Sequence, residues 1–184
     1  VAACQELYYQ YFTQVNSKKI LIGFDRRFMA SEFAKQIVPF VKGCGFEPIL
    51  SSGFVTTPSC SFYVREMKCL GALVITASHN PYDWLGLKIK SFNGCSVDDY
   101  FTNEIEKRLL LGNSIESKEG SYEIADVKKF HLKKIKSLFD VDFIASSLKK
   151  MNMQIFVDSM HGSAAKCISE IFDCNDLQIV KGIR

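Results

Sequence analysis

The amino-acid sequence predicts an α/β protein whose strands pair mainly in parallel. Three short apolar runs alternate with two stretches whose apolar residues recur at helical spacing. This strand–helix–strand–helix–strand order is typical of βαβ units, in which a helix connects two parallel strands. The first run, 19–25, is nearly continuous in apolar residues, as expected for a strand covered on both faces.

The expected elements can be followed in order along the whole chain. After a helical pattern from Val1 they are strand 19–25, helix 31–42, strand 46–51, helix 57–68, strand 71–76, strand 87–92, a helix that begins near Ser96 and runs to Leu111, a loop over 113–122, helices 126–139 and 142–150, strand 153–158 and helix 164–172. A chain that opens at Val1, directly in a helical pattern, is expected to have a cut or unresolved N-terminus.

The expected helix starts rest on residues that favour N-caps. Ser31 and Asp142 each precede a helical pattern, and a serine or aspartate side chain can accept a hydrogen bond from the first turn. Ser96 and Asp99 have the spacing of a capping box. Pro39 is expected to kink or shorten its helix, because proline has no backbone donor.

A domain boundary is expected near residue 150, where a lysine-rich helical pattern ends. Residues 1–150 would form a first α/β domain, and residues 151–184 would form an incomplete second domain. One strand and one helix cannot bury their apolar faces alone.

Composition and charge exclude several classes of protein. The 184 residues are 47% hydrophobic and 23% charged, which excludes a disordered or fibrous chain. A net charge of +3, with no clustered cationic stripe, argues against nucleic-acid binding. The 7 cysteines are odd in number and scattered, as in a reducing compartment. The longest apolar run, 70–77, is too short to span a bilayer, so we expect a cytoplasmic protein without membrane contacts.

The stretch Thr76-Ala77-Ser78-His79-Asn80-Pro81 is the strongest functional signal. It follows an apolar strand, and ligands of parallel sheets bind beyond the carboxyl ends of the strands. Pro81 fixes its own backbone and restricts Asn80, so a stiff loop presents a hydroxyl, an imidazole and an amide. Such a loop suits the positioning of a reacting group. The alternative is an Asn-Pro turn that merely ends the strand.

This stretch resembles the active-site serine loop of the α-D-phosphohexomutase superfamily, the phosphoglucomutases and phosphomannomutases. Four further stretches resemble family motifs in the same order: Gly23-Phe24-Asp25-Arg26-Arg27, Thr57-Pro58, Gly86-Leu87-Lys88 and Val157-Asp158-Ser159-Met160-His161-Gly162. The resemblance implies the family's first domain, with a mixed, mostly parallel sheet sandwiched by helices, followed by the start of a second, similar domain.

The resemblance implies an enzyme that moves a phosphoryl group between the 1- and 6-positions of a hexose phosphate. Ser78 would carry the phosphoryl group, and a bisphosphorylated sugar would form as an intermediate. One oxygen of the phosphoserine would bind Mg²⁺ together with aspartates of a D-G-D-x-D-R loop, which this sequence lacks. A glucose 1,6-bisphosphate-type activator would load the serine.

The resemblance also implies roles for four neighbouring residues. His79 would relay a proton, or else orient the loop. Lys88 would face the transferring phosphoryl group as a cation and as a general acid or base, and the alternative is an ordinary lysine at a strand edge. Arg27 would hold either the loop or a phosphate, and Asn80 would bind substrate or phosphate. A structural role for Asp25, paired with an arginine, is at least as well supported as a chemical one.

Two alternatives remain open for the function. A phosphoglucosamine mutase would run the same chemistry on another sugar, and a non-catalytic homologue would bind sugar phosphates only. The chain departs from the family pattern at Leu85, where the family often has asparagine before the glycine, and at Trp84, which replaces the usual tyrosine and is a mild change. Because the later domains of the family have no counterpart in these residues, the chain alone is expected to be inactive.

Overall fold

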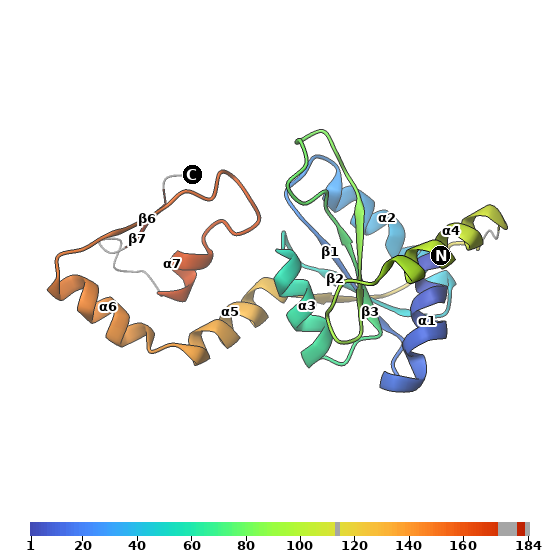
Figure 1. Ribbon diagram of the computed structural model, residues 1–184, viewed down its shortest axis with the longest axis horizontal. Coiled ribbons are helices and arrows are strands. Elements are labelled where there is room, and N and C mark those ends of the chain that lie inside the picture. Colours follow the sequence, from blue (N-terminus) through green and yellow to red (C-terminus); the bar gives the residue numbers. More distant parts are fainter. Residues whose placement is uncertain (113–114, 173–179, 183–184) are drawn as a thin grey trace. The chain divides into compact units, whose positions relative to one another are not determined.

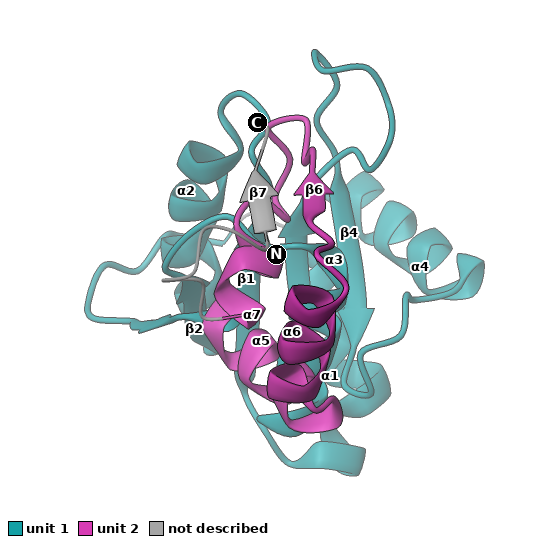
Figure 2. Cartoon of the chain, turned by 90° about the vertical axis from the view of Figure 1, so that its left-hand side faces the viewer, with its two compact units in different colours: residues 1–127 teal, residues 128–184 magenta. Residues whose placement is uncertain are grey.

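The computed structural model describes residues 1–112, 115–172 and 180–182 (Figure 1). Internal contacts divide the chain into two compact units, Val1–Val127 (unit 1) and Lys128–Arg184 (unit 2), which are coloured separately in Figure 2. Within unit 2, Lys128 donates a hydrogen bond to the Ala165 carbonyl and pairs with Glu170. The domain boundary near residue 150 stays a prediction.

Unit 1 is an α/β unit built on a five-stranded sheet. Its elements are α1 (Ala2–Val15), β1 (Lys19–Phe24), α2 (Ala30–Gly43), β2 (Glu47–Ser51), α3 (Thr57–Glu66), β3 (Gly71–Ile75), β4 (Leu87–Ser91), α4 (Asp99–Leu110) and β5 (Glu123–Ala125). The strand order is β4-β3-β1-β2-β5. β3 pairs with β1, β1 with β2 and β2 with β5, all in parallel, whereas β4 pairs with β3 in the antiparallel direction. The predicted mixed, mostly parallel sheet is therefore confirmed.

Helices cover both faces of this sheet (Figure 1). On one face, Leu7 of α1, Val38 of α2 and Phe101 of α4 share an apolar core with alternate residues of β1. On the other face α3 packs closely, because a Cβ added to Gly23 in β1 would meet the sulfur of Cys60 in α3. This packing fixes β1, β3 and α3 relative to one another, and the loop that carries Ser78 begins at the carboxyl end of β3.

The expected cap of helix α2 is wrong. Ser31 does not cap it, because the helix begins earlier, after Met29 in a left-handed conformation, and the Ser31 hydroxyl bonds to Glu32 instead. Pro39 does not shorten the helix, which continues through this residue and ends at Gly43, and a kink at Pro39 stays a prediction.

Aspartates other than the expected residues cap α4 and α6. Asp98 has an extended backbone and accepts a hydrogen bond from the Phe101 amide, whereas Ser96 accepts one from Lys90 and belongs to no capping box. Asp140 rather than Asp142 caps α6. In each case the cap is the aspartate at which the backbone turns into the helix.

Unit 2 contains α5 (Val127–Leu138, whose first residue lies in unit 1), α6 (Val141–Lys150), β6 (Ile155–Val157), α7 (Cys167–Ile171) and β7 (Val180–Gly182). β6 and β7 pair in parallel. The expected strand 153–158 and helix 164–172 are both present but shorter than predicted. β5 lies just after the expected loop 113–122, at residues for which no element is predicted, because three residues among polar neighbours give no strand pattern. Part of the 113–122 loop, residues 113–114, lies outside the described residues.

Candidate functional site

Ser78 lies in the loop that connects β3 with the antiparallel β4, at the carboxyl edge of the parallel strands. The residue is exposed and has a left-handed backbone, with a φ of 58°. A non-glycine residue in this conformation costs roughly 1–2 kcal/mol, so the surrounding contacts must hold it there. One such contact is the hydrogen bond of 3.0 Å from the Ser78 amide to the Thr76 hydroxyl.

Arg27, which follows β1, holds this loop through its guanidinium group. Nη1 donates to the carbonyls of Pro81 at 2.6 Å and Trp84 at 3.0 Å. Nη2 donates to the carbonyls of Ser78 at 2.9 Å and Asn80 at 2.8 Å. A single side chain thus ties both halves of the serine loop to the end of β1.

Asp25 in turn holds Arg27. One carboxylate oxygen lies 3.3 Å from Nε of Arg27, and the other accepts a hydrogen bond of 3.0 Å from the Arg27 amide. The Asp25 amide donates to the carbonyl of Ile75, the last residue of β3. The sequence suggested that Asp25 pairs with an arginine, and the structure shows this pair with Arg27.

His79 and Asn80 are both exposed in the same loop. The Asn80 amide donates to the Ala77 carbonyl at 3.1 Å, which closes a tight turn around Ser78 and His79. Within the described residues, the His79 imidazole makes no hydrogen bond or ion pair. Its predicted role in proton relay or loop orientation stays a prediction.

Lys88 lies near the start of β4, directly after the serine loop. It is half-buried and pairs in register with Val74 of β3. Its ammonium group makes no hydrogen bond or ion pair to any described residue. Lys88 is therefore a cation beside the serine loop, and no described residue neutralises its charge.

Sequence reasoning assigned no role to Lys90, which lies on the same strand face as Lys88 by the two-residue period. It is only 8% exposed, and its Nζ donates to the Ser96 hydroxyl at 2.9 Å. Burial lowers the pKa of Lys90, and the Lys88 ammonium lowers it further. A buried cation thus lies beside Lys88. The two-residue period places the two lysines on one face, but no pattern in the sequence indicates that Lys90 is buried.

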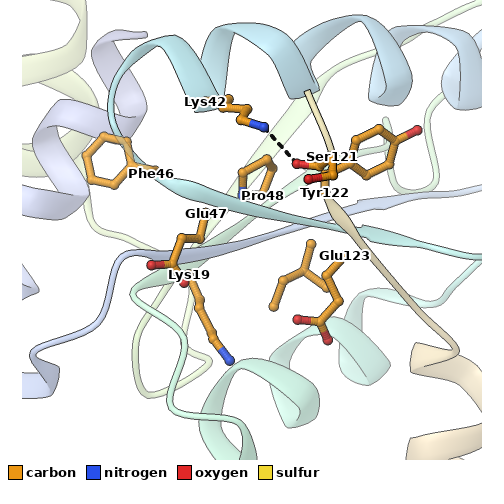
Figure 3. Close-up of a pocket in the computed structure, with 9 residues that line it drawn as sticks. Lys19, Lys42, Phe46, Glu47, Pro48, Ser121, Tyr122 and Glu123 are labelled. Carbon is orange, nitrogen blue, oxygen red and sulfur yellow. Dashed lines mark hydrogen bonds between the residues drawn. The ribbon is translucent and has the colours of Figure 1, made fainter. Parts of the chain in front are cut away.

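A cavity of about 320 Å³ lies at the other end of the strands and does not include the serine loop (Figure 3). Lys19, Glu47 and Glu123, the first residues of β1, β2 and β5, contribute to its lining. Lys42 points toward the Ser121 carbonyl and donates a hydrogen bond of 2.8 Å to it. The candidate site is therefore the open carboxyl edge of the sheet rather than this cavity.

Side chains that could hold a metal ion do not gather in the described part of the chain. None of its residues form a group of three or more histidine, cysteine, aspartate or glutamate residues that could do so.

Comparisons with known proteins point to one family. A family model described as phosphoglucomutase/phosphomannomutase, alpha/beta/alpha domain I, matches residues 1–114. A phosphoglucomutase of Staphylococcus haemolyticus is 26% identical over 161 residues, which cover 85% of this chain and 29% of that protein. A phosphoglucosamine mutase of Prochlorococcus marinus is 30% identical over 159 residues, which cover 83% of this chain and 33% of that protein.

Solved structures show the same likeness. A Thermus thermophilus protein, provisionally assigned as a phosphomannomutase, matches with a TM-score of 0.78 and 29% identity. The match covers 99% of this chain and 40% of that one. The phosphoglucomutase parafusin of Paramecium shares the fold, with a TM-score of 0.74 and 20% identity over 98% of this chain and 38% of that one. This chain spans about a third of the length of the curated relatives it matches.

Proposed function

This chain belongs to the phosphoglucomutase/phosphomannomutase family, and we propose that it supplies the phosphoserine-bearing part of a phosphohexomutase. The reaction would move a phosphoryl group between the 1- and 6-positions of a hexose phosphate. Because the chain is about a third as long as its relatives, the activity is proposed for this chain carried in a polypeptide of their length, called the mutase-length protein below.

The position of the Ser78 hydroxyl carries this proposal. Ser78 is exposed at the carboxyl edge of the sheet, on a loop fixed by Arg27 and Asp25. Phosphoryl transfer depends on positioning and charge neutralisation more than on covalent chemistry by the protein. A nucleophile held at one place on an open sheet edge meets the first of these requirements.

The proposed steps balance without a co-reactant other than the sugar. In the first step the bond between phosphorus and Ser78 Oγ breaks, a bond between phosphorus and the oxygen of the free sugar hydroxyl forms, that hydroxyl loses its proton to a base, and Ser78 Oγ takes up a proton. The bisphosphorylated sugar then turns over, and its other phosphoryl group returns to Ser78 Oγ, which gives up its proton, while the sugar oxygen that it leaves regains a proton. A glucose 1,6-bisphosphate-type activator would load Ser78 initially.

Lys88 is proposed as the cation that faces the transferring phosphoryl group and as a general acid or base. Its unpaired ammonium beside the loop supports this assignment. His79 is proposed to relay a proton or to orient the loop. Asn80 is proposed to bind substrate or phosphate. For Arg27 the contacts support the loop-holding alternative over phosphate binding.

The family resemblance implies a Mg²⁺ ion, but the described residues do not by themselves fit one. Mg²⁺ prefers six oxygen ligands in octahedral geometry, anchored by carboxylates. The phosphorylated Ser78 would offer one oxygen, and no carboxylate cluster accompanies it in the described part of the chain. We therefore derive no step through the metal, and a requirement for Mg²⁺ remains a proposal for the mutase-length protein.

The substrate and the cellular location of the protein are also proposals. The 30% identity to a phosphoglucosamine mutase favours an amino sugar phosphate as the second candidate substrate. A non-catalytic homologue that binds sugar phosphates is the third alternative. The cytoplasm is the proposed location, and none of the described helices is long and apolar enough to cross a bilayer. Nucleic-acid and membrane partners are not proposed.

Phosphorylation of Ser78 is the test of this function. The mutase-length protein is incubated with glucose 1,6-bisphosphate, and peptide mass spectrometry locates the added phosphate. We expect one phosphate on Ser78 and none in the Ser78→Ala variant. Ser59 and Ser91 serve as internal controls because both are buried. A phosphate on another serine with Ser78 unmodified would contradict the assignment, and no phosphate at all would favour the non-catalytic homologue.

A further inference from the structure

The Arg27 guanidinium has no Nη hydrogen left for a ligand. Its four Nη hydrogens meet the carbonyls of Pro81, Trp84, Ser78 and Asn80. Its Nε lies 3.3 Å from a carboxylate oxygen of Asp25, as an ion pair. Guanidinium has five N–H donors, so four are hydrogen-bonded to the loop and the fifth lies beside a carboxylate. The side chain is also only 13% exposed.

We propose that Arg27 is a positioning residue that sets the shape of the serine loop, and that Asp25 fixes Arg27 in turn. This proposal rests on the proposed role of Ser78 as the phosphoryl carrier. The charge of Arg27 is then directed at the loop carbonyls and at Asp25. A phosphoryl group on Ser78 must be neutralised by other cations, and Lys88, near the start of β4 directly after the loop, is the proposed one.

The arrangement of acceptors explains why an arginine occupies this position. The four carbonyls belong to residues spread over Ser78–Trp84, and they converge on one planar group. A guanidinium fork offers donors in fixed, divergent directions within its plane. A lysine ammonium carries three donors on one atom and cannot meet four carbonyls and a carboxylate at once.

The left-handed backbone of Ser78 depends on the same contacts. The Ser78 carbonyl bonds to Nη2 of Arg27, and the Ser78 amide bonds to the Thr76 hydroxyl. The peptide groups on both sides of the residue are thereby fixed in the strained conformation. Without Arg27, the loop would relax and the Ser78 hydroxyl would lose its fixed direction.

Two substitutions separate shape from charge. Arg27→Lys keeps the charge and loses the fork, and Arg27→Met loses both. If Arg27 acts through shape, the two variants should behave alike. Arg26 provides the matched control, because this adjacent arginine is exposed, stacks over the Phe54 ring and makes no hydrogen bond to the described part of the loop. Arg26→Lys and Arg26→Met should leave the loop unchanged.

Amide hydrogen exchange measures loop order without any phosphoryl chemistry. In the unphosphorylated mutase-length protein, we expect both Arg27 variants to raise exchange about tenfold at the amides of Ser78, Asn80 and Trp84, which are hydrogen-bonded within the loop. Exchange of the β1 and β3 amides should be unchanged, which shows that the sheet is intact. The kcat should fall about 10²-fold in both variants, with KM changed much less.

Other outcomes of this experiment would overturn the proposal. Unchanged loop exchange in Arg27→Met would show that Arg27 does not order the loop. Near-normal loop protection and activity in Arg27→Lys, with loss in Arg27→Met, would show that Arg27 acts as a charge. Should Arg27→Met fail to fold, amide exchange is measured in Asp25→Asn instead. Asparagine keeps the shape of the Asp25 side chain but removes its charge, which weakens the contact with Arg27. Normal loop exchange in Asp25→Asn would overturn the part assigned to Asp25.

The failure of this proposal can be told apart from the failure of the proposed function. If the loop loosens in the Arg27 variants but Ser78 of the unchanged protein never accepts a phosphate, the phosphohexomutase assignment is wrong and the positioning role stands. If Ser78 is phosphorylated normally while loop exchange is unaffected in the variants, the function stands and the positioning role is wrong.

Discussion

Lys88 carries a formal charge at the edge of the serine loop without an ion-pair partner among the described residues. If it neutralises charge that develops on the transferring phosphoryl group, Lys88→Met in the mutase-length protein should lower kcat by about 10²-fold or more. KM should change less, because the interaction forms mainly in the transition state. Steady-state kinetics check this, with the exposed Lys35→Met as the control. Normal kcat in Lys88→Met would make Lys88 an ordinary strand residue.

The cysteines should differ strongly in reactivity. A hydrogen bond from Cys4 lowers the pKa of Cys44 to about 7, although partial burial acts against this. Burial raises the pKa of Cys60 and of Cys69 to about 12. Because the thiolate is the nucleophile, iodoacetamide at pH 7.5 should label Cys44 well before Cys60 or Cys69, and the Cys44 rate should fall as the pH drops below 7.

A pair of variants tests the cause of this difference. Cys4→Ala removes the donor and should slow Cys44 labelling at pH 7.5, whereas Cys4→Ser keeps a donor and should slow it less. Peptide mass spectrometry over time gives the rates. Equal labelling rates for Cys44 and Cys60 in the unchanged protein would contradict the prediction.

The serine loop could be identified at the residue scale because its sequence is a literal match to a family motif. The sequence also suggested the Asp25–arginine pair and left open whether Arg27 holds the loop or a phosphate, but it did not show which loop groups Arg27 contacts. Arg27 bonds to backbone carbonyls 51–57 residues away, and carbonyls leave no side-chain signature in the sequence. The predicted helix caps were wrong for another reason. A cap is decided by where the backbone turns into the helix, and Asp140 and Asp142 differ by only two positions.

At the scale of elements, a buried ion pair joins α1 to α4. Arg108 Nε lies 2.9 Å from a carboxylate oxygen of Glu6, which is only 4% exposed. The other Glu6 oxygen accepts from Gln10, and the Arg108 guanidinium lies 4.6 Å from the centre of the Tyr9 ring. The pair therefore fixes how α4 packs against α1, and it has no sequence signal because the partners are 102 residues apart.

Breaking this pair should destabilise unit 1. Arg108→Met leaves the Glu6 carboxylate buried without its cation, and we expect a loss of about 1–3 kcal/mol in the free energy of unfolding. Adding Glu6→Gln should recover part of that loss, because a neutral amide needs no cation. Urea unfolding measures both variants. Lys107→Met, which breaks the exposed pair with Glu104, is the control and should cost less than about 1 kcal/mol. Unchanged stability in Arg108→Met would show that the pair is not structural.

Most elements of unit 1 could be predicted because strand and helix periods in the sequence match the burial that the fold requires. β1 and β3 are apolar on both faces, since helices cover both sides of the sheet. β5 escaped prediction because its first two residues, Glu123 and Ile124, are exposed and only Ala125 is buried. The pairing of β5 with β2 depends on the sheet, and no local pattern shows it.

At the scale of the molecule, the serine loop lies exposed at the carboxyl edge of the sheet of unit 1. Phe28, Tyr82 and Trp84 lie on the loops at this edge with exposed aromatic side chains. Unit 2 exposes further large apolar side chains: Leu138, Phe139, Phe143, Met151, Met153, Phe156 and Met160. An open edge admits water, and phosphoryl transfer to a sugar rather than to water requires that water be excluded.

This openness leads to a prediction about the 184-residue chain taken alone. Unit 1 has a continuous apolar core between sheet and helices, so we expect the chain to fold at least in that unit. We expect it to turn over no substrate. Within unit 1, Ser78, His79 and Asn80 are exposed, so nothing in the described part of this unit holds a sugar against Ser78 and the advantage of a bound, oriented hydroxyl is lost.

A coupled assay checks the prediction with glucose 1-phosphate, Mg²⁺ and glucose 1,6-bisphosphate, run on the chain and on the mutase-length protein side by side. Circular dichroism of the chain confirms that the failure to turn over is not a failure to fold. The mutase-length protein should be active, and its Ser78→Ala variant should match the inactive chain. Turnover by the chain comparable to that of the mutase-length protein would mean that these residues contain the whole catalytic apparatus. The division of the chemistry between Ser78 here and groups supplied by further sequence would then be wrong.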